Sequence, residues 1–195
     1  MAEPPLLLRS DPDPSWLPAG SRADVMLGEP PADEPTGLVR LMVLRGNEFF
    51  CMMREPDGRL DIPTRHVAEG EDPHDTAHAL ASVVLGPDAE VRPWGYVRNF
   101  VPTPSNDYPW PSPVACFTVW RPMSGAPVVP GLWCARIELG TRHWWPLAEQ
   151  AARGPHPDKS GSQSCTNKVV ADFQSRRDLD NSGIGNYICI STNRE

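Results

Sequence analysis

A chain of 195 residues with a net charge of −7 fits one domain of ordinary size with tails. Its 24 prolines exceed the usual share of about 5%, which predicts a loop-rich fold with short strands and excludes a long helical bundle. Because no basic patch accompanies the negative charge, we expect no binding to DNA or RNA, for which such a patch supplies the affinity.

Five cysteines are scattered along the chain and form no CxxC pair: Cys51, Cys116, Cys134, Cys165 and Cys189. An odd, scattered set favours reduced thiols over a disulfide or zinc framework. The N-terminal region contains no basic segment followed by an apolar run, and "PPLLLRS" is too short for a signal peptide or a membrane span. We therefore expect a soluble cytoplasmic protein with no membrane partner. Its oligomeric state stays open, with a homodimer as one option.

Composition divides the chain into three segments. Residues 1–36 are rich in Pro, Asp and Glu, and we expect a mostly disordered arm with at most one docking strand. Residues 37–155 form the predicted domain. Residues 156–195 form a tail of uncertain origin, because lysine first appears at Lys159 and Lys168. This tail is either a foreign appendage or a natural extension, and we place no function in it.

The predicted domain begins with a hairpin and a capped helix. Residues 38–44 and 49–53 are apolar runs separated by Gly46-Asn47, two residues that tolerate a positive φ. Asp57-Gly58 marks a second turn. A helix is then predicted over residues 73–85, with Asp72 as its N-cap, a proline at its first position and Asp75 as the acid of a capping box. It ends at the Gly-Pro pair of residues 86–87.

Strands and a last short helix follow. Residues 89–101, 114–122 and 132–140 have strand character, and proline-rich loops separate them. Residues 144–153 lead into a short helix. The order of strands, helix, strands and helix predicts an α+β fold and not the regular alternation of a doubly wound sheet.

Residues 37–153 resemble a Nudix domain. The likeness rests on the order of "DGRLDIP", "VAEGEDPHDTA" entering a helix, several strands, and "HWWPLAEQ" at the last helix. The family's box, G-x5-E-x7-R-E-U-x-E-E-x-G-U, would begin at Arg65 in place of its first glycine, with its isolated glutamate at Glu71 and its last glycine at Gly86. The resemblance implies an α/β/α sandwich with a mixed sheet, a box helix and a C-terminal helix.

The helix carboxylates of the box are missing. The family's Arg-Glu pair falls on Ala79 and Leu80, and its Glu-Glu pair falls on Val83 and Val84. Nudix hydrolases, as the resemblance implies, cleave nucleoside diphosphate compounds with magnesium or manganese, and such cations require oxygen ligands. Hydrocarbon side chains offer none. We therefore expect no metal cofactor at this helix and little of the family's usual activity.

Displaced carboxylates are the alternative. Glu71 and Glu69, with Asp72 and Asp75, are the candidate catalytic acids of an active, non-standard pyrophosphohydrolase that would use Mg or Mn. The simpler interpretation is that acids before a helix stabilise the positive end of its dipole.

Two histidines share one face of the predicted helix. His74 and His78 stand at i and i+4, a spacing that suits zinc, but no third ligand lies close in sequence. We expect them to be surface histidines.

A ligand pocket remains a separate expectation. By the resemblance, Tyr108 and Trp110 would stack on a ring, and Arg65 and Arg98 would contact phosphates. The alternative is that these aromatic residues anchor a long loop to the core. The leading hypothesis is a Nudix-fold protein that lacks the metal-dependent cleavage and binds a nucleotide-like ligand or a protein partner. A structural or regulatory interaction domain, with the apolar helix face as its interface, is a further alternative.

Overall fold

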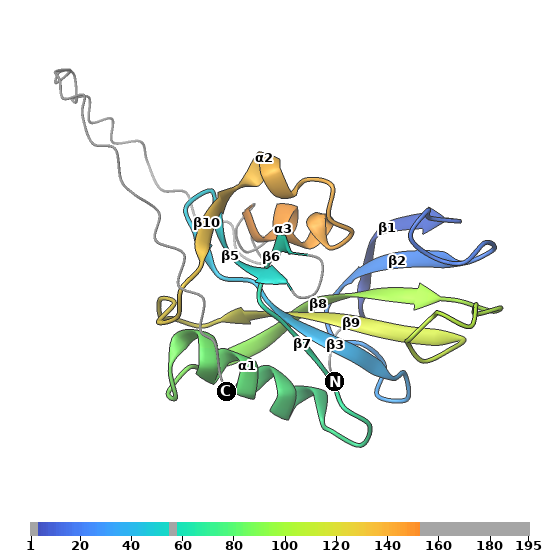
Figure 1. The fold of residues 1–195 in the computed structure, drawn as a ribbon, viewed down its shortest axis with the longest axis horizontal. Helices are drawn as coiled ribbons and strands as arrows, with labels where there is room; N and C mark the ends of the chain where they lie inside the picture. The colour runs from blue at the N-terminus through green and yellow to red at the C-terminus, as the bar shows by residue number, and fades with distance from the viewer. Residues whose placement is uncertain (1–3, 55–57, 153–195) are drawn as a thin grey trace, which may run out of the picture. The chain divides into compact units, whose positions relative to one another are not determined.

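The computed structural model describes residues 4–54 and 58–152. The predicted tail and Asp57 of the second predicted turn lie outside these residues. Figure 1 shows the elements, which are, in chain order, β1 (Leu6–Pro12), β2 (Arg22–Leu27), β3 (Thr36–Leu41), β4 (Leu44–Arg45), β5 (Glu48–Arg54), β6 (Arg59–Asp61), β7 (Thr64–His66), α1 (Pro73–Leu85), β8 (Val91–Phe100), β9 (Val114–Pro122), β10 (Leu132–Ala135), α2 (Arg136–Leu139) and α3 (Trp145–Ala152).

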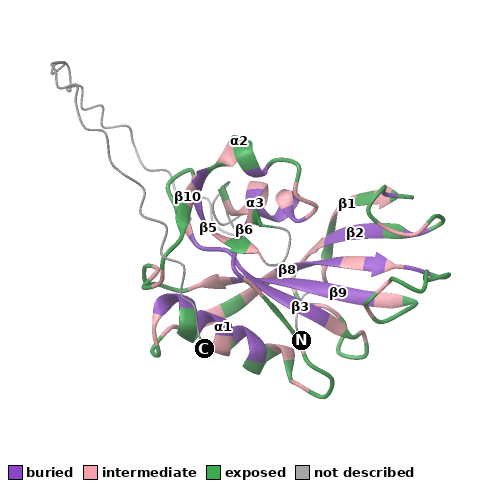
Figure 2. Cartoon of the chain, in the orientation of Figure 1, coloured by how far each residue is buried: buried purple, intermediate pink, exposed green. Residues whose placement is uncertain are grey.

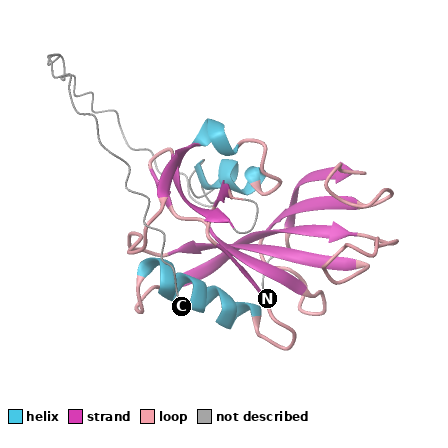
Figure 3. Cartoon of the chain, in the orientation of Figure 1, coloured by secondary structure: helices cyan, strands magenta, loops and turns pink. Residues whose placement is uncertain are grey.

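A six-stranded sheet forms the centre of the fold, with strand order β1-β2-β8-β9-β3-β7. Strand β3 runs parallel to β9, and the other neighbours are antiparallel, so the sheet is mixed. A smaller sheet contains β10, β5 and β4, and β6 pairs with β5. A mixed sheet with few helices is an α+β arrangement (Figure 3), and this prediction is confirmed.

Strand β3 divides the core into two parts. Successive side chains of a strand point to opposite faces of the sheet. Leu38 and Met42 accordingly join a cluster that includes Leu147 of α3, whereas Val39 joins a cluster that includes Val84 of α1. The two helices therefore cover opposite faces of the sheet, as an α/β/α sandwich requires. Figure 2 shows the buried residues concentrated in β3, β8 and β9 at its centre.

The N-cap, the first-turn proline and the final glycine of α1 act as the sequence predicts, whereas the capping box expected at Asp75 does not form, because the Asp72 carboxylate bonds the N–H of His74 and not that of Asp75. The carboxylate of Asp72 accepts a hydrogen bond from the backbone N–H of His74 at 2.7 Å, and Pro73 occupies the first turn. Gly86 ends the helix with a φ of 104°. The buried face consists of Thr76, Ala77, Leu80, Ala81, Val84 and Leu85. His74 and His78 are exposed at the surface, where the His74 ring meets Trp120 edge-on with centroids 4.8 Å apart.

The predicted hairpin is shorter than expected. Residues 46–47 connect β4 to β5, with Arg45 opposite Glu48 and a φ of 58° at Gly46. Residues 36–41 do not take part in this hairpin, because β3 pairs with β7 and β9 in the large sheet.

The expectation of a mostly disordered N-terminal arm is wrong for residues 6–27. Strands β1 and β2 pair with each other, and β2 pairs along its whole length with β8. Ala23 and Val25 are each 1% exposed and belong to the core. A strand at the margin of a sheet needs apolar residues on one face only, so a polar average composition conceals it. The prolines lie largely in the connecting loops.

No helix in the part of the chain that the structure describes is both long enough and apolar enough to cross a membrane.

Candidate functional site

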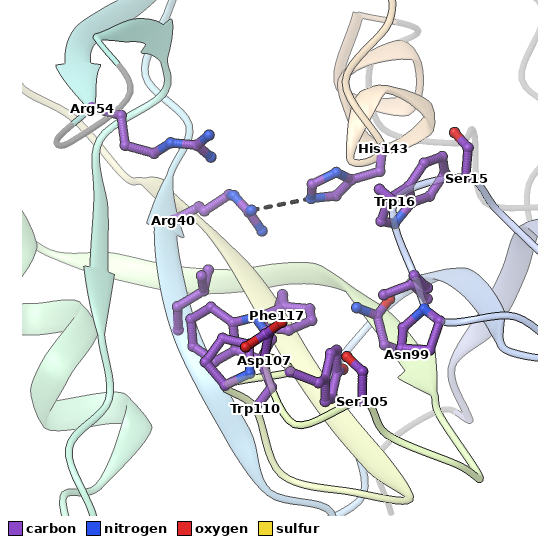
Figure 4. Close-up of a pocket in the computed structure, with 15 residues that line it drawn as sticks. Ser15, Trp16, Arg40, Arg54, Asn99, Ser105, Asp107, Trp110, Phe117 and His143 are labelled. Carbon is purple, nitrogen blue, oxygen red and sulfur yellow. Dashed lines mark hydrogen bonds between the residues drawn. The ribbon is translucent and has the colours of Figure 1, made fainter.

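A cavity of about 440 Å³ lies on the α3 side of the large sheet. Its lining comes from the loop between β1 and β2 (residues 15–18), from β3, β5, β8 and β9, from the loop of residues 105–110, and from His143 before α3. Figure 4 shows these side chains converging from segments that lie far apart in the sequence.

Arg40 extends into this cavity from a core position of β3. It lies between Leu38 and Met42 in the alternating pattern of the strand, and it is only 4% exposed. Burial lowers its pKa to about 10, so the guanidinium keeps its charge at neutral pH. Its Nη2 donates to Nε2 of His143 at 3.1 Å (Figure 4), but its Nε and Nη1 have no hydrogen-bond partner. A buried charge with unpaired donors is costly, and a bound anion would remove that cost.

His143 is held in its neutral form. Burial, followed by the charges of Arg40, Arg54, Arg142 and Arg9, lowers its pKa to about 3. Since an arginine can only donate, the bond to Arg40 makes Nε2 the acceptor and places the imidazole proton on Nδ1. Four guanidinium groups therefore act on one small region.

Among the described residues, Asp61 supplies the negative charge that faces this region from the core. Its Oδ1 accepts hydrogen bonds from Trp144 Nε1 at 3.0 Å and from the backbone of Ile62 at 2.9 Å. Its Oδ2 lies 3.9 Å from Arg54. Asp107 also lines the cavity but is exposed to solvent. Arg9 is paired with Asp11 at 2.9 Å, and Arg40 and Arg54 are the arginines that line the cavity. Asp61 offsets only part of the charge of these two residues, so the cavity favours anions.

Aromatic rings form the walls of the cavity. Trp16 stacks on His143, with centroids 5.9 Å apart and an angle of 28° between the ring planes. Trp110 stacks on His66 at 4.9 Å and meets Phe117 edge-on at 5.0 Å. The indole of Trp110 rests on the backbone at Gly37, where a Cβ atom would lie 2.7 Å from Trp110 Cε3. These contacts fix the ring surfaces before any ligand binds.

Two polar atoms in the lining also lack hydrogen-bond partners. They are Oδ1 of Asn99 and the hydroxyl of Tyr108. Burial raises the pKa of Tyr108, and Asn99 offsets part of this effect. A hydroxyl donor and an amide acceptor beside aromatic walls suit a planar ring that carries polar groups at its edge.

The structure places two of the four predicted ligand residues in the cavity. Tyr108 and Trp110 line it, but Arg65 and Arg98 do not. Arg98 is held by Glu34, because its Nε donates to both carboxylate oxygens at 2.9 and 2.7 Å and its Nη2 donates to Oε1 at 2.6 Å. This pairing raises the pKa of Arg98 and lowers that of Glu34. Arg65 forms an exposed ion pair with Glu71 at 3.3 Å.

The two candidate acids lie in the loop before α1. Glu71 accepts a hydrogen bond from the backbone N–H of Ala68 at 3.1 Å, and this bond is the main cause of its lowered pKa. Glu69 is exposed. Both line an open hollow that Glu34 also borders. Within residues 4–54 and 58–152, no group of three His, Cys, Asp or Glu side chains is placed to hold a metal ion.

Several residues of the cavity were not among the candidates from the sequence, namely Trp16, Arg40, Arg54, Asn99 and His143. The sequence does contain a signal for one of them, Arg40. In "GLVRLMVL" the two-residue period of a strand places Arg40 on the same face as Leu38 and Met42. A charge at a core position of a strand often belongs to a site.

The neutral His143 predicts a specific pH dependence. An unfolded chain binds a proton on this imidazole below about pH 6.5, whereas the folded protein does so only near pH 3. As the pH falls from 6.5 towards 3, the free energy of unfolding therefore decreases by up to about 1.4 kcal/mol per pH unit through this residue. Above pH 6.5 this contribution is constant.

Urea unfolding of the wild type and of His143→Gln at pH 7, 6, 5 and 4.5 isolates this contribution from that of the carboxylates. We expect the wild type to lose more stability than the variant over this range. An NMR titration of the His143 ring with a midpoint near pH 6.5 would contradict the assignment.

Comparison with known proteins gives distant structural likenesses. No protein-family model matches the sequence, and no curated protein matches it. The chain is similar to a mutant of the Bacillus subtilis pyrophosphohydrolase BsRppH, with 11% identity over 58% of this chain and a TM-score of 0.41. The match spans 64% of the length of that enzyme.

Two smaller proteins give comparable matches. A MutT from a study of Aliivibrio salmonicida and Vibrio cholerae is 14% identical, with 62% of this chain and 95% of that chain covered and a TM-score of 0.38. The E. coli ORF135 protein is 16% identical, with 67% and 99% covered and a TM-score of 0.40. Similarity at this level does not extend to substrate or activity.

Proposed function

We propose that this chain is a Nudix-fold protein that binds a nucleotide-like ligand in the cavity around Arg40 and lacks the family's metal-dependent cleavage. The observation that carries the proposal is the buried guanidinium of Arg40, whose Nε and Nη1 have no partner in a cavity with aromatic walls. The Nε–H and Nη1 groups point to different sides of the planar guanidinium, so they take separate acceptors, and a phosphate offers several charged oxygens that can accept from such donors.

The charge around the cavity favours phosphate as the anionic group of the ligand. Arg40 and Arg54 line the cavity, and the buried carboxylate of Asp61 offsets part of their charge. A phosphate carries between one and two negative charges near neutral pH. Whether free or esterified, it keeps at least one full negative charge and offers more acceptor oxygens than most anionic groups, which suits a guanidinium with separate unpaired donors.

The aromatic walls support a planar ring as the second part of the ligand. Trp16 and Trp110 both line the cavity, and the unpartnered atoms of Asn99 and Tyr108 would satisfy polar groups at a ring edge. A ring joined to a phosphate is the chemistry of a nucleotide. Stacking on such walls contributes about 1–3 kcal/mol per base.

The loss of cleavage is supported by the residues of α1. The positions at which the resemblance calls for helix carboxylates carry Leu80, Val83 and Val84, whose side chains have no oxygen. A magnesium or manganese ion would find no ligand on these residues.

A second candidate function is a non-standard hydrolase. Glu34, Glu69 and Glu71 border one open hollow before α1, and this arrangement favours that alternative. Because Glu71 and Glu34 already pair with Arg65 and Arg98, the hydrolase would have to release those pairs to bind a cation.

One experiment separates the two functions. The melting temperature is measured with adenosine, AMP, GMP, CMP, UMP and ADP-ribose, with Mg²⁺ or with EDTA, and the products are analysed after incubation. We expect at least one monophosphate to stabilise the protein without Mg²⁺ and without turnover, and adenosine to have little effect. At a ligand concentration 100 times Kd the gain is about 2.7 kcal/mol, or roughly 5–10 °C.

Arg45→Met is the matched control, because Arg45 is an exposed arginine paired with Glu48 and does not line the cavity. It should keep the response to nucleotide. Mg²⁺-dependent release of products would support the hydrolase instead. A panel without any stabilisation by phosphate-bearing compounds would contradict ligand binding at Arg40.

A further inference from the structure

A second groove continues from the cavity around Arg40. It has a volume of about 500 Å³ and lies where β7 ends the large sheet. It shares four lining residues with the cavity, namely Leu38, Arg40, Arg54 and Trp110. Arg40 and Arg54 therefore stand at the junction of the two spaces, and a ligand whose anionic group meets Arg40 would extend into both.

The walls of this groove are largely hydrocarbon. Met52 and Met53 of β5 line it together with Leu80, Val83 and Val84 of α1. Met53 is 63% exposed and Val83 is 61% exposed. Two large apolar side chains left open to water in one groove, next to a buried cation, indicate a surface that a ligand covers. Methionine side chains also adapt readily to the shape of an apolar partner.

The aliphatic residues of α1 make their wall of this groove unsuited to a second phosphate. The three aliphatic residues of α1 in the lining stand at the positions where the resemblance would place acids that hold cations around a diphosphate. A charged group against them would lose its hydration without gaining a partner. The polar groups of the lining are few, and one of them, His66, is stacked on Trp110. An aliphatic group fits this surface.

We propose that the ligand is amphiphilic: an aliphatic substituent on its phosphate lies in the groove between β5 and α1 while its ring lies in the cavity. This inference rests on the proposed nucleotide site, and it names the ligand class as an alkyl- or acyl-linked nucleotide. A flexible chain bound at the phosphate leaves that group with a single negative charge, which Arg40 can pair through an unpartnered N–H group.

The test uses probes that differ only in chain length. Isothermal titration calorimetry is carried out with AMP and with its methyl, butyl and octyl phosphodiesters, and with butyl and octyl phosphate as probes without a base. Each methylene that becomes fully buried tightens binding by about fourfold. Because the groove is open, we expect the octyl ester to bind at least about tenfold more tightly than the methyl ester.

Val83→Gln tests the location of the chain. Position 83 is exposed on α1, so this variant should fold, and we expect it to lose most of the gain from the octyl chain while its affinity for the methyl ester stays the same. Val128→Gln is the control, because Val128 is 67% exposed and does not line the groove. It should retain the full gain.

The outcomes separate this inference from the proposed function. Binding of AMP without any effect of chain length overturns the amphiphilic ligand and leaves the nucleotide site standing. Tighter binding of octyl phosphate than of butyl phosphate, without binding of AMP, supports the groove and contradicts the nucleotide site. The inference is overturned if Val83→Gln and Val128→Gln lose the same share of the affinity gained from the octyl chain. It is also overturned if chain length has no effect on binding in either probe series.

Discussion

Replacing Arg40 by methionine is expected to raise the melting temperature of the free protein and to abolish its stabilisation by a nucleoside monophosphate. The guanidinium is 4% exposed and has two unpaired donors, so its burial costs free energy that only a ligand recovers. Exchange of a complete buried ion pair for well-packed apolar groups is often neutral or stabilising by up to about 4 kcal/mol, and here Asp61 keeps Arg54 at 3.9 Å as a cationic partner after Arg40 is replaced. Loss of the bond to His143 subtracts about 1 kcal/mol.

The expected gain corresponds to a rise of roughly 2–10 °C in melting temperature at this chain length. It is measured by calorimetry in buffer without phosphate, because phosphate would stabilise the wild type selectively. Arg45→Met again provides the control, with a loss of about 1 kcal/mol or less expected, because its exposed ion pair with Glu48 and its contact with the Trp133 ring each contribute little. A free Arg40→Met protein that is clearly less stable than the wild type would show that Arg40 serves the fold and not a ligand.

Replacing Asp61 by asparagine is expected to lower the free energy of unfolding by about 3–5 kcal/mol, the usual cost of leaving a buried charge without its partner. Asparagine keeps an oxygen that can accept from Trp144 Nε1, so packing changes little. What disappears is the negative charge that offsets Arg40 and Arg54. Inorganic phosphate should restore more stability to this variant than to the wild type.

The double variant Asp61→Asn with Arg40→Met tests the cause of this loss. In the Arg40→Met background, Asp61→Asn should lower the free energy of unfolding by less than half as much as it does in the wild type, because the effects of two interacting residues are not additive. The four proteins are compared by urea unfolding at pH 7. Strict additivity of the two single changes would mean that Asp61 supports Trp144 and Ile62 alone and does not balance the charge of the cavity.

Local signals in the sequence predict local structure well here. The residues that cap α1 are adjacent to it in the chain, and the N-cap acid, the proline and the final glycine all occupy the expected positions. The turn at Gly46 depends on two residues only. Such features need no knowledge of distant contacts, so a single sequence is enough to predict them.

The features of the fold and of the cavity that the sequence did not predict depend on contacts between residues far apart in the chain. The partner of Arg98 is Glu34, which is 64 positions away in the chain, and nothing in either neighbourhood indicates the other. The partner of Arg40 is His143, which is 103 positions away. For residues 1–36 the sequence predicted at most one docking strand, and the pairing of β2 with β8 has no local signal because β8 lies far along the chain. The aromatic loop residue Trp110 was predicted, since a tryptophan between prolines is conspicuous in any context.

The loop that joins β1 to β2 bears on how the selectivity of the cavity can change during evolution. It supplies Trp16 and neighbouring residues to the wall of the cavity, although it lies outside the segment that resembles a Nudix domain. The loop shares no residue with the face of α1 or with the strands at the centre of the sheet. Substitutions at its exposed positions, such as Ser15, can alter the fit of the proposed ligand without removing core contacts, so selectivity can drift over evolutionary time without a matching loss of structural integrity.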